Sequence, residues 1–380
     1  MHLRYAEPTR QEEDFFRILK KRVFARLHEK NQTRYANLNM WLRVTFFFTG
    51  FFASWSCLVF AQMPVALTLA FCVLLSFFGT GIALNVGHET SHGNLSPRPW
   101  VNSFLYRFSM SLLGTSDLNW KTGHIETHHK YVNVGGSDVG VEANGALRFT
   151  AHTKWFPKFR YQHFFAIPLY CFYTLAWVIF RDWRVLLEGQ VSGAKLNPSF
   201  KKFFDLFLIK AFYFGYLLVI PMVFSRFSVG EILFGFVFIN AVYSLYIACF
   251  LFVSHLAIGP AFPRPNSEGR LPMSYIRHQL VCTMDVMPES RFASFCLGGF
   301  NTHAVHHLFP NICSVHYPEL TKILKETCHE FKMPYLEKSL GAALKAHFDF
   351  LYKMGQEPME LKNATSPSAI KPQETVAWLS

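Results

Sequence analysis

Three short histidine-rich runs restrict the fold of this chain more than any other feature of its sequence. The runs read His88-x-x-x-His92, His124-x-x-x-His128-His129 and His303-x-x-His306-His307. If the runs are helical, histidines three or four positions apart lie on one face, so each such pair could chelate one ion. Neighbouring histidines such as His128 and His129 point roughly 100° apart around a helix, so one run can reach two ions. Together the runs predict a dinuclear metal site.

Four long apolar stretches predict that the chain spans a membrane four times. They cover residues 42–60, 65–86, 203–224 and 232–256. Each is close to the ~20 residues that cross a bilayer as a helix, and short connections join them into two hairpins. The chain is 51% hydrophobic and contains 42 Phe residues, a composition suited to side chains that face lipid.

A fifth apolar stretch, residues 164–180, is shorter, contains Pro168 and ends next to Arg181. The three histidine runs can share metal ions only if they lie on one side of the membrane. An even number of crossings must therefore separate the second run from the third, and the hairpin formed by residues 203–256 already supplies two. We therefore expect residues 164–180 to be interfacial or re-entrant.

The distribution of basic residues indicates on which side of the membrane the histidine runs lie. Lys and Arg concentrate in residues 4–43, 98–130, 148–210 and 264–291, whereas the two hairpin loops carry only Arg226. Because cytosolic loops are enriched in these residues, the histidine runs and both termini are expected in the cytosol. Aromatic-rich apolar runs separate the basic clusters that make up the formal net charge of +12. This favours anionic lipid headgroups or an acidic redox partner and argues against nucleic acid.

The expected fold is an all-α membrane protein with four transmembrane helices in two hairpins and a cytosolic helical cap that holds the metal site. Residues 8–38 predict a basic helix lying on the membrane surface, with an ordinary soluble helix as the alternative. Residues 317–330 and 335–353 predict amphipathic helices of the cap. We expect one membrane domain, residues 1–354, and a disordered tail, residues 355–380, in which Pro, Ser, Asn and Thr show no periodicity.

The ligand chemistry narrows the possible reactions. Imidazole suits Zn, Cu, Fe and Ni, so the ligands alone do not select the metal. Two-metal hydrolases usually recruit bridging carboxylates, but the acids near the runs, Glu89, Glu126 and Asp138, do not recur from run to run. Many neutral nitrogen ligands around two irons favour activation of O2, and the oxidant could attack an unactivated C–H bond of a chain delivered from the bilayer.

The order and spacing of the three runs resemble the histidine boxes of the integral-membrane fatty acid desaturases. The similarity extends to Asn119-Trp120 before the second box, to Gly298-Gly299-Phe300-Asn301 before the third, and to Leu308-Phe309-Pro310 and Val315-His316-Tyr317-Pro318 after it. These motifs look most like the bacterial linoleoyl-CoA and front-end desaturases, and the resemblance covers residues 10–340. Front-end enzymes usually begin the third box with Gln. This chain has His303 there, like the stearoyl-CoA-type enzymes.

The resemblance implies a di-iron enzyme that uses O2 to introduce a double bond into a fatty-acyl chain linked to CoA or to a lipid. It implies two iron ions held by His88, His92, His124, His128, His129, His303, His306 and His307. The family places an extra metal-binding histidine between the second and third boxes, a position that His255 occupies here. The sequence has no His-Pro-Gly-Gly haem motif of a fused cytochrome b5, so electrons are expected from a separate ferredoxin or from cytochrome b5 with its reductase.

A few other polar residues are candidates for supporting roles. Asp138 and Asp285 could orient ligand imidazoles by accepting their N–H groups, with solvated loop acids as the alternative. His316 could support a ligand or begin a helix. Three further histidines are expected at the surface or at an interface: His152, His163 and His278.

Two other functions remain open at this point. A lipid or alkane hydroxylase, or a carotenoid oxygenase, shares the three-box architecture, and the sequence does not reveal whether oxygen rebound or loss of a second hydrogen follows the first abstraction. A non-enzymatic metal-binding membrane protein, such as a transporter, is the distant alternative. Transport calls for polar or ionisable residues at mid-membrane depth, and the expected spans contain almost none.

Overall fold

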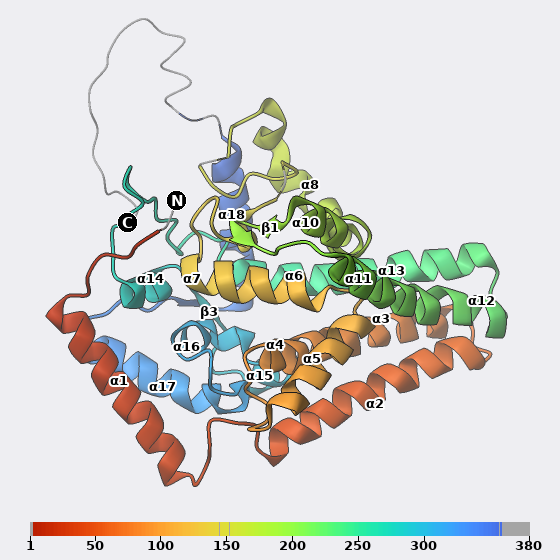
Figure 1. The fold of residues 1–380 in the computed structure, drawn as a ribbon, viewed down its shortest axis with the longest axis horizontal. Coiled ribbons are helices and arrows are strands. Elements are labelled where there is room, and N and C mark those ends of the chain that lie inside the picture. The colour runs from red at the N-terminus through yellow and green to blue at the C-terminus, as the bar shows by residue number, and fades with distance from the viewer. Residues whose placement is uncertain (1–2, 144, 152, 357, 359–380) are drawn as a thin grey trace, which may run out of the picture.

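The computed structural model describes residues 3–356, except 144 and 152, together with residue 358. Helices make up most of this part of the chain, which confirms the all-α class (Figure 1). Its strands pair only in twos: β1 (Gln190–Val191) is antiparallel to β2 (Ala194–Lys195), and β3 (Asp285–Val286) is parallel to β4 (Glu337–Lys338). Most of the tail predicted over residues 355–380 lies outside the described residues.

Among the described residues, four helical segments are long and apolar enough to cross a membrane, as predicted: Leu38–Phe60, Val65–Ser91, Phe200–Phe224 and Val229–Ser254. A bent helix pair would make a fifth if its two halves formed one span. The first is α2 (Leu38–Phe60), and the second consists of α3 (Val65–Ile82), the π-helical turn η1 (Ala83–Gly87) and α4 (His88–Ser91). The third consists of α11 (Phe200–Phe214), the π-helical turn η6 (Gly215–Val219) and α12 (Ile220–Phe224). The fourth is α13 (Val229–Phe250), extended by η7 (Phe252–Ser254).

The two hairpins pack together, with α3 in contact with both α2 and α13 (Figure 1). Phe47 of α2 and Leu75 of α3 are buried in one apolar cluster, whereas Phe52 on the outer face of α2 is exposed, as suits a residue that faces lipid. At the loop end, Arg226 of the second hairpin donates a hydrogen bond to the carbonyl oxygen of Met63 in the first. The histidine runs lie at the opposite end of the spans.

The fifth apolar stretch forms a bent helix pair that packs beside α13. Its elements are η4 (Pro157–Tyr161), α8 (Gln162–Cys171), α9 (Tyr173–Ala176), η5 (Trp177–Arg181) and α10 (Asp182–Glu188). The two halves, Pro157–Cys171 and Tyr173–Glu188, meet at 66°. Just after the bend, the backbone N–H of Thr174 donates to Oγ of Ser244 in α13, at 3.0 Å. A broken helix at membrane depth needs such a partner, whether the pair crosses the membrane or re-enters it, so the re-entrant path stays a prediction.

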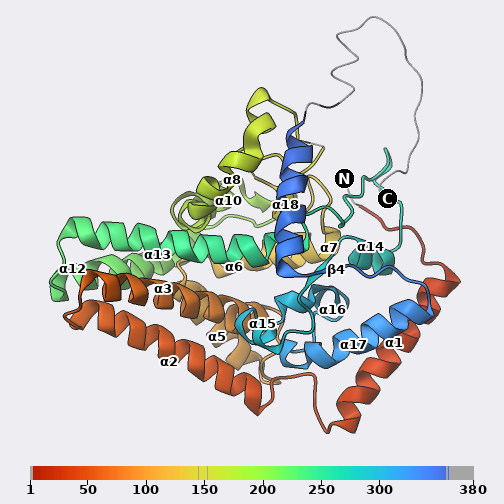
Figure 2. The same ribbon diagram turned by 180° about the vertical axis from the view of Figure 1, so that it is seen from behind.

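The first helix, α1 (Arg10–Glu29), does not lie on a membrane surface with its apolar face. Its buried residues Phe15, Leu19 and Val23 pack in one apolar cluster with Leu320 and Leu324 of α17 (Tyr317–Glu330). Figures 1 and 2 show α1 and α17 side by side at the end of the molecule away from the hairpin loops. The membrane-surface interpretation is therefore wrong, and the alternative of an ordinary helix holds, because another protein helix already covers the apolar stripe.

The remaining elements surround the histidine runs. They are α5 (Pro99–Leu112), α6 (Asp117–Lys121), η2 (Thr122–His128), α7 (His129–Tyr131), η3 (Val139–Val141), α14 (Tyr275–Val281), α15 (Arg291–Cys296), η8 (Phe300–Thr302), α16 (His303–Leu308), η9 (Ser314–His316) and α18 (Leu340–Gly355). The helix predicted over residues 335–353 begins later than expected, because β4 occupies part of the range. Figure 2 shows α18 beside α8, and the two helices are in contact.

Candidate metal centre

The first histidine run is the end of a membrane span. The helix of α3 continues through the π-helical turn η1 into α4, so His88 is fixed to the span without a flexible link. The rings of His88 and His92 lie 5.0 Å apart between centroids, on one face as predicted. Next to them, Thr90 Oγ1 donates a hydrogen bond of 2.6 Å to the carbonyl oxygen of Val86, which ties this turn to the π-helical segment.

The second histidine run differs from its prediction, because its backbone is not α-helical. Residues Thr122–His128 form a π-helical turn, in which hydrogen bonds connect positions five apart. This turn brings His124 and His129 together, with their Nε2 atoms 3.1 Å apart. His128 joins a different group of histidines. The expected pairing of His124 with His128 at one ion is therefore wrong.

A pair of glycines allows the third run to approach the first. Gly298 and Gly299 have φ angles of +57° and +81°, in the left-handed region that favours glycine. A Cβ atom on Gly298 would lie 2.6 Å from the carbonyl oxygen of Leu84 in η1. In this run too the expected pair separates, since His303 and His306 belong to different groups.

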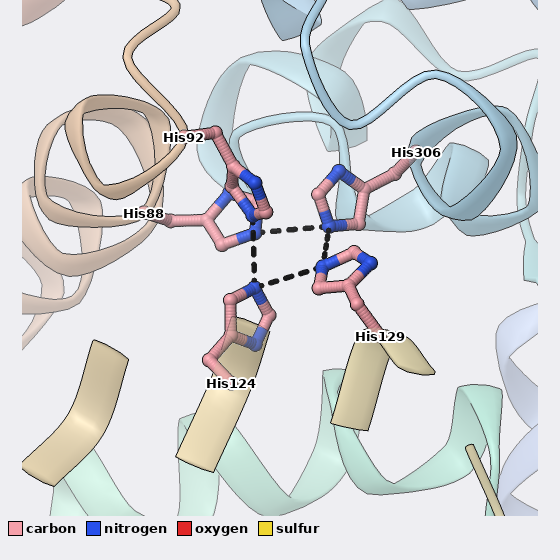
Figure 3. A group of neighbouring side chains, drawn as sticks. All are labelled: His88, His92, His124, His129 and His306. Carbon is pink, nitrogen blue, oxygen red and sulfur yellow. Dashed lines mark hydrogen bonds between the residues drawn. The ribbon is translucent and has the colours of Figure 1, made fainter. Parts of the chain in front are cut away.

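Five histidines from all three runs form the first cluster: His88, His92, His124, His129 and His306 (Figure 3). The Nε2 atom of His306 lies 3.1 Å from that of His88 and 2.9 Å from that of His129. The Nε2 atom of His124 lies 3.1 Å from those of His92 and His129. The rings thus point their nitrogen atoms at a common centre, as Figure 3 shows.

Four histidines form the second cluster: His128, His255, His303 and His307. Three of them donate from Nδ1 to an oxygen: His128 to Asp138 at 3.0 Å, His255 to the carbonyl of Cys282 at 2.9 Å, and His307 to the amide oxygen of Gln279 at 2.9 Å. With the proton on Nδ1, the lone pair of Nε2 is left free for a metal. The Nε2 atoms of His255 and His307 are buried and have no hydrogen-bond partner in the described part of the chain.

The doubled histidines divide between the two clusters as predicted. His129 and His306 join the first cluster, while their neighbours His128 and His307 join the second. His255, the candidate from outside the runs, joins the second cluster as well. All nine candidate residues are therefore brought together, although their role as ligands stays a prediction.

The protonation state of the clusters suits a cation. Burial lowers the pKa of His92 to about 3 and that of His255 to about 3, and in His255 the nearby His128 adds to the effect. Burial and neighbouring imidazoles hold the pKa values of five others well below their usual range: His124, His129, His303, His306 and His307. These rings are neutral at pH 7, the form that binds metal. Two groups of converging, buried imidazole nitrogens fit two metal ions.

Asp138 plays the supporting role predicted for it. Burial alone would raise the pKa of Asp138, but His128 and the backbone N–H groups of Gly140 and Asn133 hold it below its usual value. Gly140 and Asn133 donate to the two carboxylate oxygens at 2.7 Å each. The carboxylate is therefore charged, and it fixes the ring of His128 through the bond to Nδ1.

Two other supporting predictions need correction. Asp285 does not accept a hydrogen bond from an imidazole; it accepts one from the backbone N–H of Ala304 at 2.8 Å, so it holds the first turn of α16. In the described part of the chain His316 contacts no cluster and pairs with the carbonyl oxygen of Tyr35 at 3.0 Å. It is the N-cap residue of α17, so the alternative that it begins a helix is confirmed.

The other histidines lie outside both clusters. His278 was expected at the surface or at an interface, but it is fully buried and donates from Nε2 to the carbonyl oxygen of Val132 at 2.9 Å. His163 is partly exposed, as predicted. His152 lies outside the described residues.

Replacing Asp138 with Asn is expected to weaken metal binding at the second cluster by about 10- to 100-fold. The amide would lack the charge that supports the His128 Nδ1 proton, while the size of the side chain would not change. Titration of the metal-free protein in the presence of a competing chelator measures the effect. Asp349→Asn is the control, since Asp349 only forms an exposed ion pair with Lys345. An unchanged affinity in Asp138→Asn would show that this carboxylate does not act through His128.

A cavity of about 520 Å³ adjoins the two clusters. Its wall includes His124 of the first cluster and three histidines of the second: His128, His255 and His303. Most other lining residues are apolar or aromatic. They include Leu169, Phe172 and Trp177 of the bent helix pair, Ile247 of α13 and Phe252 of η7. The volume falls within the ~300–1,000 Å³ of typical ligand sites. An apolar cavity that ends at two histidine clusters suits an alkyl chain.

Several contributors to the site were missed by the sequence reasoning. Trp120 stacks on the ring of His124, with centroids 4.5 Å apart, and also lines the cavity. Tyr317 places its hydroxyl 3.2 Å from Nδ1 of His306, and Gln279 holds His307. Trp120 and Tyr317 stand inside the motifs that carried the resemblance, so those motifs were a usable signal. No pattern in the sequence marks Gln279.

Comparison with known proteins gives a consistent result. The family model described as fatty acid desaturase matches residues 63–339. An sn-1 linoleoyl-lipid 6-desaturase from Synechocystis is 29% identical, over 91% of this chain and 97% of the relative. An acyl-lipid (8-3)-desaturase from Physcomitrium patens is 30% identical, over 93% of this chain and 74% of the relative. An sn-1 linoleoyl-lipid 6-desaturase from Arthrospira platensis is 29% identical, over 90% and 93% respectively.

Proposed function

This chain belongs to the fatty acid desaturase family, and we propose that it introduces a double bond into the acyl chain of a membrane lipid, using O2 and two irons held by its two histidine clusters. The single observation that carries the proposal is the apolar cavity that leads to both clusters. The names of its relatives support the same reaction and a lipid-linked substrate.

Two vicinal hydrogens leave the acyl chain as a C=C bond forms, O2 is reduced to two water molecules, and two electrons and two protons come from outside the substrate. When bound, two irons would supply the oxidising power that an unactivated C–H bond requires. We propose that an external ferredoxin or cytochrome b5 delivers the electrons.

The residues of the chain itself have three tasks in this reaction. The apolar wall formed by residues such as Phe252 and Ile247 binds the alkyl chain and excludes water from it. Trp120 and Phe300 line the cavity and also contact the clustered histidines, so they can hold one pair of methylene groups against the metal centre. Positioning of this kind decides which bond reacts.

We also propose that the histidine end of the spans faces the cytosol. Two features support this orientation. The loop end of the hairpins carries only Arg226 among Lys and Arg residues, whereas basic residues are frequent in the segments at the histidine end. A cytosolic site is also within reach of a soluble electron carrier.

Expression of the chain in a host with a compatible ferredoxin or cytochrome b5 system should produce an unsaturated fatty acid that the host lacks. Mass spectrometry of intact lipids and of their released fatty acids would locate the double bond and identify the lipid class that carries it. The two remaining outcomes are informative: a product with a hydroxyl group and no new double bond favours the hydroxylase alternative, and an unchanged lipid profile with iron-loaded enzyme argues against both.

A further inference from the structure

We propose that the acyl chain enters sideways from the bilayer, while still attached to a glycerophospholipid, through an opening at the bend of the α8–α10 helix pair. The inference rests on the proposed desaturation and adds to it the route of the substrate and the chemistry of its carrier.

Some cavity-lining residues are also exposed on the outside of the protein. Phe172 and Phe180 line the cavity with exposed fractions of 56% and 69%, and Leu169 does so with 38%. Ala176, which lies between them in the sequence, lines the cavity and is exposed as well. A side chain that borders the cavity and is also exposed lies at its mouth. The mouth therefore opens in part on the surface of the bent pair, where its rim is mostly apolar.

The outer face of the bent pair has the character of a lipid-facing surface. Phe164, Ile167 and Leu187 do not line the cavity, yet they are exposed by 72%, 49% and 71%. An exposed cluster of such large apolar side chains in water would be costly, but it is normal at membrane depth. The hydrogen bond from the Thr174 backbone to Ser244 of α13 satisfies the broken helix there, as lipid surroundings require. The mouth thus opens towards the acyl chains of the bilayer.

A basic side chain stands at the mouth. Arg181 lines the cavity, and its guanidinium lies 4.1 Å from the ring centroid of Trp177. It interacts with the Tyr173 side chain and lies near Glu142, but in the described part of the chain no carboxylate oxygen lies within 4.0 Å of it, so its guanidinium can still pair with a phosphate. Arg184 also lines the cavity, but Glu188 already pairs with it at 2.7 Å.

The charges at the mouth favour a phospholipid over a CoA thioester. CoA carries several phosphate groups, and a site that binds it would need several unpaired cations. The wall carries two arginines and no lysine, and Arg184 is already paired with Glu188, so Arg181 is left as a single cation for an anionic ligand. One cation beside an apolar rim fits a single headgroup phosphate with its acyl chain in the cavity.

Photo-crosslinking tests the route without relying on turnover. The full chain would be reconstituted in nanodiscs that contain a phosphatidylglycerol with a diazirine in its acyl chain, and the labelled peptides would be identified by mass spectrometry. We expect labels within residues 169–181 and on the α13 residues that line the cavity, such as Tyr243 and Ile247. Labels confined to residues outside the cavity wall would overturn the proposal.

A pair of tryptophan variants provides the matched comparison. Ala176→Trp should fill the mouth and lower both labelling of the α13 residues and desaturation by about 10-fold or more, since misplacing a substrate is that costly. Ile179→Trp adds the same side chain to the same turn, but Ile179 does not line the cavity, so both readouts should stay within about twofold of the wild type. Iron content and thermal stability of the two variants would be compared first, and Phe180→Trp would replace an Ala176→Trp protein that fails to fold.

The carrier is tested with the purified wild type. A chain borne by phosphatidylglycerol in the nanodisc should be desaturated, and the same chain supplied as a CoA thioester should not. Turnover of the thioester alone, or equal labelling of α13 in Ala176→Trp and the wild type, would refute the proposal while leaving the desaturase function intact. If the iron-loaded wild type forms no double bond on either substrate but labels as expected, the lateral route holds and the proposed function fails.

Discussion

Replacing His306 with Ala is expected to abolish desaturation and to lower the iron content from about two ions per chain to about one. His306 belongs to the first cluster alone, where its Nε2 lies 3.1 Å from that of His88. His128→Ala should remove the other ion, because His128 belongs to the second cluster alone. Loss of a direct ligand should lower the activity by about 10²-fold or more. Even the loss of a residue that only hydrogen-bonds to a ligand lowers metal affinity or activity by about 10- to 100-fold.

Metal analysis of the purified variants, together with lipid profiling of the cells that express them, measures both effects. His316→Ala is the matched control, because His316 is a buried histidine close to the third run that touches neither cluster. It should keep about two irons per chain and most of its activity. Stoichiometric zinc without iron in the wild type would contradict the oxygenase chemistry. If His306→Ala and His128→Ala each released both ions, the clusters would not be independent sites.

Replacing Lys210 with Met is expected to destabilise the protein by about 3–5 kcal/mol, because it leaves a buried carboxylate without its partner. Lys210 lies in the span α11, and its Nζ donates to Oδ2 of Asp182 at 2.6 Å, with side chains only 5% and 1% exposed. The same carboxylate accepts hydrogen bonds from the backbone N–H of Ser116 at 2.9 Å and from Nδ2 of Asn119 at 3.2 Å. The ion pair therefore joins a span, the bent pair and the segment that leads into the second histidine run.

The double variant Lys210→Met with Asp182→Asn should recover most of this loss, because it removes both charges together and keeps a side chain that can bond Ser116. Thermal unfolding in detergent, followed by the loss of bound iron and by tryptophan fluorescence, compares the variants. Lys201→Met is the control, since Lys201 is exposed near the start of the same helix. A single variant as stable as the control, or a double variant less stable than the single one, would mean that the attraction between Lys210 and Asp182 does not stabilise the protein.

Much of the architecture could be predicted because it depends on local composition. The stretches 42–60 and 203–224 were recognisable as spans, since a bilayer demands about 20 apolar residues wherever a helix crosses it. The re-entrant path of residues 164–180, inferred from the need to bring the runs together, stays a prediction. The doubled histidines His128 and His129 also divide between clusters as their angular separation requires. These inferences need only helix geometry and the membrane as a solvent.

The errors arose where the outcome depends on contacts with distant segments. The basic helix α1 was placed on the membrane because amphipathicity shows that a face must be covered, but not that α17 covers it. The burial of His278 depends on the carbonyl of Val132, which no local pattern reveals. The pairing of His124 with His129 depends on a π-helical turn, and such a turn has no sequence signature to set it apart from an α-helix.

The sequence by itself determined which residues form the site: nine histidines, their order along the chain, and the spans that hold them at one end. Only the tertiary structure decided how these nine divide into groups of five and four, because that division depends on the backbone of η2 and on the approach of Gly298 to Leu84. It also decided where the cavity opens. The opening lies at the bend at Phe172, next to the hydrogen bond between Thr174 and Ser244. These two residues are 70 positions apart, so the bond forms only when the fold brings them together.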